Sequence, residues 1–416
     1  MNIKDNLLKI AEKAEKELNE IFMDIDSTAF FNTSKVLSAF KTHRVTDAHF
    51  AGTTGYGYND MGRDTLDKVY AAVFAAEAAL VRTGFVSGTH AIAAALFAIL
   101  NPGDTLLSLV GMPYDTIQTV IGVSGNEHGS LKHYGINFDF VDIDSSGRAD
   151  LAEIKAKLSK LRPAAVLIQR SKGYSSRETL NIAEIESLCE LVKKISPDTV
   201  VFVDNCYGEF TEEREPTEVG ADIMAGSLIK NPGGGLATTG GYIVGKEELI
   251  TKAGSSLTAP GIGAEGGASL GQNRLFYQGF FMAPHTTAQA LKTAHLAAAI
   301  AEKTGFKTHP GSQSKRSDII QCIELRAPDK IIKFCKGIQS GSPVDSFISP
   351  VPYLMPGYED EVIMAAGTFI QGASIELSAD APMREPYSVF LQGALTYEAG
   401  KLGILNAFNE ILEDEE

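Results

Sequence analysis

The first segment of the chain alternates between hydrophobic and charged residues with a helical period. Apolar residues recur there at spacings of three or four, which places them on one side of a helix. The pattern predicts a helix whose apolar face packs against the rest of the protein. The positions that define this face are Leu7, Ala11, Ala14, Leu18 and Ile21.

Two further helices are predicted before the first strand. One spans residues 64–82, where Leu66, Val69 and Val73 fall on one side. The other runs from Gly88 to Leu100 and ends at an Asn-Pro-Gly turn.

Short apolar runs and helical patterns then alternate along the chain. Such alternation is typical of an α/β protein in which a parallel sheet carries helices on both faces. The predicted strands are residues 105–110, 138–141, 164–169, 199–203, 223–227 and 241–244, and the helices between them are residues 151–161 and 182–195.

The pattern changes after an alanine-rich helix predicted over residues 289–303. Short strands and helices are mixed beyond it, so we expect a smaller α+β domain there. Its predicted elements are a strand at 319–325, a helix at 329–338, strands near 362–366 and 373–377, and a closing helix over about 388–411. The predicted division is an N-terminal helix and arm over 1–55, a large domain over 56–306 and a small domain over 307–416.

Charge and composition narrow the classes of function. The 416 residues include 37 Lys and Arg against 52 Asp and Glu, a net charge of −15, which argues against nucleic-acid binding. The longest apolar stretch is shorter than the ~20 residues that a membrane span needs. The four cysteines show no Cys-x-x-Cys spacing, and the histidines show no metal-binding spacing such as His-Glu-x-x-His. We expect a cytoplasmic protein that acts on a small molecule, without membrane or nucleic-acid partners and without a metal.

Asp204 is the first candidate for chemistry. It follows the apolar run Val200–Val203, and a buried carboxylate is costly unless it meets a positive charge. The carboxyl ends of strands in an open α/β sheet face the ligand crevice, so Asp204 is placed to meet a cationic group. A helix N-cap or a local salt bridge is the alternative.

Lys230 is the second candidate. It follows the predicted strand 223–227 and precedes Asn-Pro-Gly-Gly-Gly. Poor solvation would lower the pKa of this lysine and make its amine nucleophilic, and the glycines would let backbone approach a ligand closely. A surface lysine in a turn is the alternative.

The third candidate is the start of the helix over residues 88–100. Ser87, Gly88 and Thr89 stand there, and a helix N-terminus with hydroxyl donors binds phosphate. A plain N-cap is the alternative.

One ligand satisfies all three candidates. Pyridoxal phosphate carries a phosphate, a pyridinium nitrogen that pairs with a carboxylate and an aldehyde that condenses with a lysine. The joint pattern therefore favours this cofactor, with Asp204 and Lys230 as its partners.

The chain resembles the fold-type-I pyridoxal-phosphate enzymes of cysteine and methionine metabolism. Within them it is similar to the bacterial methionine gamma-lyase-like family, also described as aluminium resistance proteins. The resemblance implies a large domain with a mostly parallel sheet between helices, a smaller α+β domain, and elimination at Cβ or Cγ of a methionine-, cystathionine- or cysteine-type substrate. The stretches that carry it are GYGYNDMGRDTLDKVYA, LVRTGFVSGTHAI, GMPYDT, VFVDNCYGEF, GADIMAGSLIKNPGGG and FIQGASIELSADAPMREPY.

The resemblance also implies roles at the cofactor. Lys230 would hold the cofactor covalently and act as the base, and Asp204 would pair with the ring nitrogen. Tyr114 would stack on the ring and supply a proton to the leaving thiolate. The phosphate would be bound by Ser87, Gly88, Thr89 and Ser227.

Further residues are implied for the subunit contact and the substrate. Tyr56 or Tyr58, with Arg63, would reach the phosphate of a neighbouring subunit, which implies a homodimer or homotetramer. Arg384 would bind the substrate carboxylate, with a surface ion pair as the alternative. Two other functions remain open: γ-replacement or transamination with the same cofactor, and a cofactor-binding protein with a regulatory role.

Overall fold

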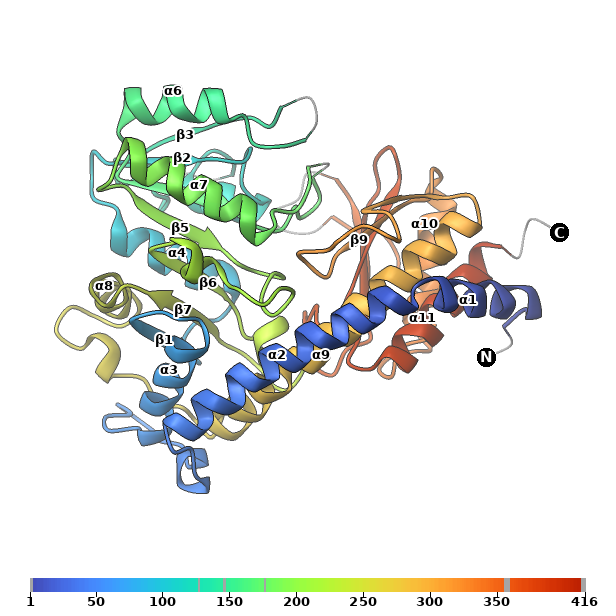
Figure 1. Ribbon diagram of the computed structural model, residues 1–416, viewed down its shortest axis with the longest axis horizontal. Coiled ribbons are helices and arrows are strands. Elements are labelled where there is room, and N and C mark those ends of the chain that lie inside the picture. Colours follow the sequence, from blue (N-terminus) through green and yellow to red (C-terminus); the bar gives the residue numbers. More distant parts are fainter. Residues whose placement is uncertain (1–2, 126–127, 145–146, 176, 355–359, 413–416) are drawn as a thin grey trace.

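The computed structural model describes residues 3–125, 128–144, 147–175, 177–354 and 360–412. A large sheet with its helices and a smaller sheet with its own helices lie at the two ends of the molecule, joined by the long diagonal helices α2 and α9 (Figure 1). Helix α9 (Asn273–Lys303) contributes Phe280 to the large core and Ile300 to the small one. Helix α2 (Asn19–Thr42) packs along α9.

The larger sheet has seven strands in the order β1-β7-β6-β5-β4-β2-β3. Strands β3, β2, β4, β5 and β6 run parallel, while β7 is antiparallel to both β6 and β1. The predicted α/β class with a mostly parallel sheet is confirmed. The strands are β1 (Ala78–Arg82), β2 (Thr105–Ser108), β3 (Asn137–Phe140), β4 (Ala165–Gln169), β5 (Val200–Asp204), β6 (Ile223–Ser227) and β7 (Gly241–Gly245).

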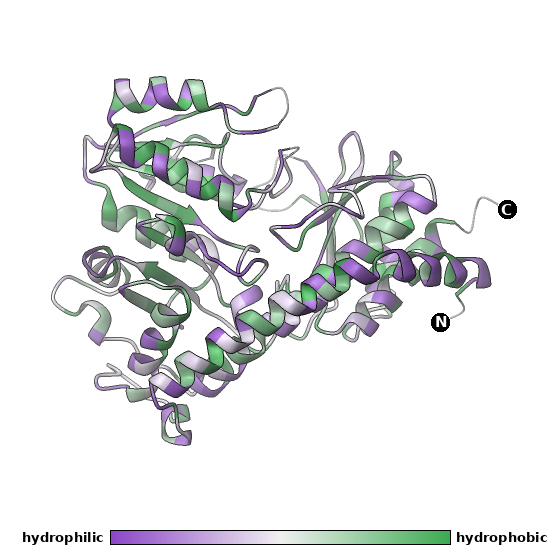
Figure 2. Cartoon of the chain, viewed as in Figure 1, coloured by the Kyte–Doolittle hydropathy of each residue, from purple (hydrophilic) through white to green (hydrophobic). Residues whose placement is uncertain are grey.

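Successive residues of each strand pack on opposite faces of this sheet. In β5, Val201 and Val203 belong to one apolar core, and Phe202 belongs to the other. Figure 2 shows the apolar strands lying between helices that mix apolar and polar residues. One face is covered by α3 (Met61–Val73), α6 (Leu151–Leu161) and α7 (Ile182–Ile195), and the other by α4 (Gly88–Ile99), α5 (Asp115–Ile121) and α8 (Glu247–Leu257).

The smaller sheet has five antiparallel strands in the order β10-β11-β12-β9-β8. Its core includes the predicted apolar face of the first helix, with Leu7, Ala11 and Ala14 almost fully buried. The elements are β8 (Lys307–His309), β9 (Gln321–Glu324), β10 (Val362–Ala365), β11 (Ser378–Pro382), β12 (Ser388–Gln392), α1 (Asp5–Glu17), α10 (Pro328–Ser340) and α11 (Tyr397–Ile411). No helix among the described residues has both the length and the apolar character to cross a bilayer.

Three sequence predictions about these elements are wrong. The helix predicted over 64–82 ends at residue 73, because Ala75 adopts a left-handed φ of 48° and residues 78–82 pair with β7. The strand predicted near 373–377 is a turn region, and the strand follows it at 378–382. Residues 388–392, predicted to open the closing helix, form β12, whose five residues are all buried and so lack the alternation that marks a strand.

Candidate active site

A pocket lies where the parallel strands of the larger sheet end and the smaller sheet faces them. Strands β4, β5 and β6 are neighbours that end in the polar residues Gln169, Asp204 and Ser227. The residues that line the pocket include Thr89, Tyr114, Gln169, Tyr174, Asp204, Cys206, Tyr207, Lys230, Ile320, Asp380, Phe390 and Gln392. The pocket therefore combines the predicted Asp204 and Lys230 with side chains from the smaller sheet.

Asp204 is buried at the end of β5 and lines this pocket. Its Oδ1 accepts a hydrogen bond from the backbone N–H of Cys206 at 3.1 Å. Burial raises the pKa of Asp204, while the charge of Lys230 acts in the opposite direction. Among the described residues no side chain forms an ion pair with this carboxylate, so it can meet a cationic group in the pocket.

Lys230 follows β6 by three residues and also lines the pocket. Its Nζ lies 3.9 Å from the ring centroid of Tyr207, a cation–π contact. Burial alone lowers the pKa of Lys230, but attraction to Cys206, Tyr207, Asp204 and Glu209 outweighs it, so the pKa is raised. The expected lowering of this pKa is wrong for the structure as described, because the sequence pattern does not reveal the acidic groups that surround the amine.

The glycines after Lys230 serve a different contact from the predicted one. A Cβ on Gly234 would lie 2.2 Å from the carbonyl oxygen of Gly279 in α9, and a Cβ on Gly233 would meet the carbonyl oxygen of Leu228. Asn231 then ties the segment to the loop after β5, since its side chain donates to the Tyr207 and Glu209 carbonyls at 3.0 Å. The glycine run thus lets the segment after Lys230 pack closely against the backbone of α9 and of Leu228.

The start of α4 lies against the end of β6. A Cβ on Gly88 would lie 3.0 Å from Cβ of Ser227 and 3.4 Å from Sγ of Cys206, so only glycine fits there without displacement. Ser87 caps the helix by accepting from the His90 N–H at 3.1 Å, and Thr89 lines the pocket. The predicted phosphate-binding residues Ser87, Gly88, Thr89 and Ser227 are therefore close to one another, and Thr89 is the one of them that lines the pocket.

Tyr114 stands at the N-cap of α5 and lines the pocket. Its backbone N–H donates to Oε1 of Gln169 at 2.7 Å. Its ring lies 5.9 Å from that of Tyr174, centroid to centroid. The predicted aromatic residue is thus fixed beside the pocket by the end of β4.

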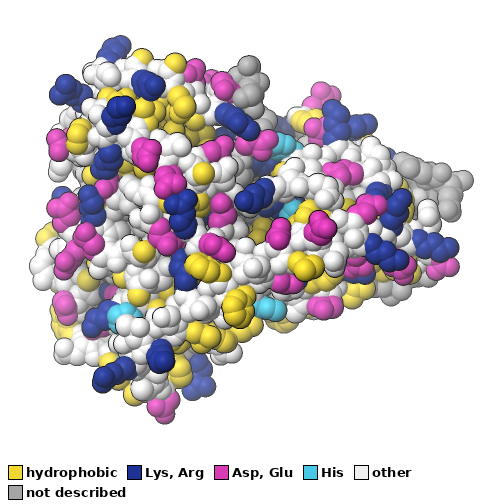
Figure 3. All heavy atoms as spheres, in the orientation of Figure 1, with side chains coloured by type: hydrophobic (Ala, Val, Ile, Leu, Met, Phe, Trp, Pro, Cys, Tyr) yellow, Lys and Arg dark blue, Asp and Glu magenta, His cyan; other side chains and the backbone are white. Residues whose placement is uncertain are grey.

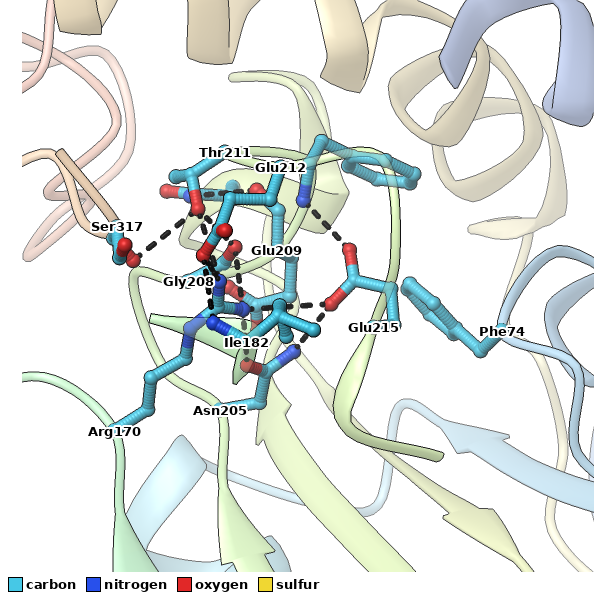
Figure 4. Close-up of polar contacts among 12 residues, drawn as sticks. Phe74, Arg170, Ile182, Asn205, Gly208, Glu209, Thr211, Glu212, Glu215 and Ser317 are labelled. Atoms are coloured by element: carbon cyan, nitrogen blue, oxygen red, sulfur yellow. Dashed lines mark hydrogen bonds and ion pairs between the residues drawn. The ribbon is translucent and has the colours of Figure 1, made fainter. Parts of the chain in front are cut away.

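A buried arginine organises the loop that follows Asp204. Arg170 donates to Oδ1 of Asn205 and to the Gly208 carbonyl, both at 2.9 Å, and pairs with Glu212 at 2.9 Å (Figure 4). Asn205 in turn donates to Glu215 at 3.0 Å. This network holds the backbone between Asp204 and Tyr207, and its central residue was not predicted from the sequence.

Tyr56, Tyr58 and Arg63 lie outside this pocket. The two tyrosines are exposed and stack on each other with ring centroids 5.5 Å apart. Arg63 is buried and donates to the carbonyls of Gly57 and Gly267 at 2.7 Å. Their contribution to a neighbouring subunit stays a prediction.

Arg384 follows β11 and is also outside the pocket. Its side chain is 55% exposed, and its guanidinium pairs with Asp360 at 3.0 Å. Its role toward a substrate carboxylate stays a prediction.

The smaller sheet supplies pocket residues that sequence reasoning missed. Asp380, Phe390 and Gln392 come from β11 and β12, and Tyr174 comes from the segment after β4. The motif stretches quoted above contain Asp380, but no spacing rule marks a polar residue in the middle of an antiparallel strand as part of a pocket.

The donor set fits pyridoxal phosphate. A pocket-lining amine, a buried carboxylate without a paired cation and a glycine-walled helix start match the aldehyde, ring nitrogen and phosphate of that cofactor. Each feature rests on a different element, so their convergence is a property of the fold.

Comparisons with known proteins agree with this geometry. The family model described as methionine gamma-lyase matches residues 7–412. The chain is 50% identical to the uncharacterised protein YnbB of Bacillus subtilis over 408 residues, 98% of this chain and 97% of YnbB. It is 52% identical to the crystal structure of a carbon–sulfur lyase involved in aluminium resistance from Clostridium novyi, with a TM-score of 0.95 over 98% of this chain and 96% of the other.

A more distant structural match shares the fold. The pyridoxal-5′-phosphate-dependent protein YhfS of Escherichia coli matches with a TM-score of 0.62 at 19% identity, over 92% of this chain and 95% of that one.

Proposed function

The chain belongs to the methionine gamma-lyase family, and we propose that it is a pyridoxal-phosphate-dependent lyase that breaks a carbon–sulfur bond in a sulfur amino acid. The observation that carries the proposal is the pocket in which Lys230 and Asp204 meet at the carboxyl edge of the larger sheet. The family match over almost the whole chain supports the same reaction class.

The residues that would hold the cofactor come from the ends of parallel strands and the start of α4. Lys230 would bind it covalently, Asp204 would keep its ring nitrogen protonated, and Gly88, Thr89 and Ser227 would bind its phosphate. When bound, pyridoxal phosphate supplies an electron sink for negative charge that develops at the substrate α-carbon.

Lys230 Nζ, in its unprotonated form, is the group that we propose takes the α-proton of the substrate. It is the one amine among the described residues that line the pocket, so proton transfer by an amine would fall to it. The ring of Tyr207 below Nζ and the loop network around Arg170 fix the position of this amine.

Tyr114 would protonate the leaving thiolate. Its side chain lines the pocket, and its backbone is fixed by Gln169, so the phenol can be held near the sulfur of a substrate. Loss of the thiol, followed by hydrolysis that consumes one water and releases ammonia, would leave a 2-oxo acid.

Product analysis tests the reaction type. The purified protein, loaded with pyridoxal phosphate, is incubated with methionine, cystathionine and cysteine in turn. Elimination predicts equal amounts of thiol, ammonia and 2-oxo acid from at least one of them. A new amino acid formed without release of ammonia would instead indicate γ-replacement or transamination, and an unchanged substrate in every case would favour the regulatory role.

The subunit arrangement is a separate proposal. Tyr56 and Tyr58 are exposed outside the pocket of their own chain, which suits residues that complete the site of a neighbour in a homodimer or homotetramer. Arg63 is buried and would support them, since it donates to the carbonyl of Gly57 between the two tyrosines. Mixing an Arg63→Ala variant with a Lys230→Ala variant tests this. Shared sites predict partial recovery of activity in the mixture, and independent sites predict none.

A further inference from the structure

The smaller sheet presents a carboxylate to the substrate side of the pocket. Asp380 is the middle residue of β11, and its neighbours Ala379 and Ala381 are fully buried in the small core. Because side chains alternate along a strand, Asp380 points to the opposite face of the sheet, where it lines the pocket beside its cross-strand partner Phe390.

Two side chains fix one oxygen of this carboxylate. Tyr174 donates to Oδ2 of Asp380 at 3.1 Å, and the Gln392 amide donates to the same oxygen at 2.8 Å. Among the described residues none donates to Oδ1. Oδ1 is not enclosed by the protein, and because Asp380 lines the pocket, this oxygen is open to it. The group is oriented, with one oxygen left for a ligand.

The charges around Asp380 favour a cation. Among the described residues, Lys230 is the one cationic side chain that lines the pocket, and it is assigned above to the cofactor. Lys172 and Arg177 stand on either side of Tyr174 in the sequence, and both donate hydrogen bonds to backbone carbonyls. Lys172 donates to the His309 carbonyl at 2.8 Å, and Arg177 donates to the Glu178 carbonyl at 2.9 Å. An anionic group at the end of a substrate would meet repulsion from Asp380.

The protonation state supports the same conclusion. Burial raises the pKa of Asp380 to about 6, against the hydrogen bonds from Tyr174 and Gln392 and the charge of Lys230. The side chain is therefore mostly ionised at pH 8. Asp380 is half-buried, and an ionised carboxylate that has lost part of its water is costly unless it meets a positive charge.

We propose that Asp380, oriented by Tyr174 and Gln392, binds a positively charged group at the far end of the substrate side chain. The preferred substrates are then sulfur amino acids that carry a second, distal ammonium group. Those that end in an uncharged alkyl group are disfavoured. This statement of substrate class rests on the proposed function, but the binding preference itself can be measured without turnover.

The binding test uses two unreactive amino acids of equal length. L-Ornithine and L-norleucine differ at the end of the side chain, where one has an ammonium and the other a methyl group. Calorimetric titration of the protein loaded with pyridoxal phosphate, at pH 8, should show at least about tenfold tighter binding of ornithine. Asp380→Asn should abolish this preference by weakening ornithine alone. Asp329→Asn, which removes the same charge from the exposed start of α10, should keep it.

Three results would overturn the proposal: equal binding of the two ligands by the wild type, an unchanged preference in Asp380→Asn, or equal weakening of both ligands. The last would place Asp380 at the α-amino group that both share.

If Asp380→Asn does not fold, Tyr174→Phe provides the second variant, because it keeps the carboxylate and removes one donor. It should reduce the preference about threefold, and an unchanged preference would contradict the orientation by Tyr174.

Turnover separates this proposal from the proposed function. S-(2-aminoethyl)-L-cysteine and S-propyl-L-cysteine form the matching reactive pair. Binding preference without thiol release from either would retain the Asp380 site and reject the lyase reaction. Thiol release from both at equal kcat/KM, with equal binding of ornithine and norleucine, would retain the lyase reaction and reject the Asp380 site.

Discussion

The pocket has two walls built from different kinds of sheet. The wall proposed to hold the cofactor, called the cofactor wall, consists of Asp204 and Lys230, at or just beyond the ends of parallel strands. The substrate wall consists of Asp380, Phe390 and Gln392, within antiparallel strands. The cofactor wall combines a cation with a carboxylate, whereas the described part of the substrate wall has a carboxylate alone. The difference suggests that the first wall serves the shared chemistry and the second selects the substrate.

The largest effect is expected from Lys230→Ala, which removes the amine of the cofactor wall. Turnover should fall by at least about 1,000-fold, because both the covalent attachment and the proton acceptor are lost. Thiol release and the mass of borohydride-treated protein check this. A cofactor adduct found on a different lysine would contradict the assignment.

The next largest effect is expected from Asp204→Asn. An amide of the same shape cannot stabilise a protonated ring nitrogen by charge, so kcat should fall about 100-fold while the fold is kept. Steady-state kinetics and circular dichroism provide the two measurements. An activity within threefold of the wild type would show that this carboxylate does not act on the cofactor.

Stability tests the support beneath the cofactor wall. Arg170→Met should lower the free energy of unfolding by about 3–5 kcal/mol, because Glu215 stays buried and loses its charged partner. Denaturant unfolding measures the change. Arg214→Met, which breaks an exposed pair with Glu186, is the control and should change stability far less. Equal effects would mean that the buried network does not support the loop.

The last effect is a pH dependence of stability from Glu209, a buried carboxyl that accepts a hydrogen bond from Tyr242 at 2.7 Å. Burial raises its pKa from 4.5 to about 8, so the folded state keeps a proton that the unfolded chain loses. Its contribution to stability therefore falls as the pH rises from about 4.5 to 8, by at most about 1.4 kcal/mol per pH unit. Glu209→Gln should flatten this decline in unfolding experiments at pH 5 to 8, and an unchanged slope would show that Glu209 is ionised in the fold.

Surface charge on one face of the molecule gives no comparable distinction between its two ends. On the face shown in Figure 3, acidic and basic side chains are interspersed over both the large and the small sheet regions.

The cofactor wall could be predicted from the sequence because of its local pattern. A buried strand followed by a polar residue is visible in the residues themselves, and the strand 223–227 and the helix 182–195 match the structure at both ends. Local signals fail where distant segments decide the outcome. Residues 78–82 become a strand because β7 pairs with them, and α9 begins 16 residues before its predicted start, with Pro284 inside it.

The substrate wall could not be predicted for a related reason. The sequence predicts a strand near 373–377, which ends before Asp380. The prediction therefore did not define the face of the sheet on which the Asp380 side chain lies. Its donors Tyr174 and Gln392 stand 206 and 12 residues away along the chain. Tyr174 meets it because the segment after β4 faces the smaller sheet, and Gln392 meets it because β12 pairs with β11.

The measurement that tests the central claim most directly is the absorption spectrum of the purified protein loaded with pyridoxal phosphate, recorded beside Lys230→Ala during titration with sulfur amino acids. The account predicts a visible band of the lysine-bound cofactor in the wild type, altered by at least one of these amino acids and absent or shifted in the variant. A wild-type protein that shows no such band after reconstitution would contradict the assignment of Lys230 and Asp204 to the cofactor.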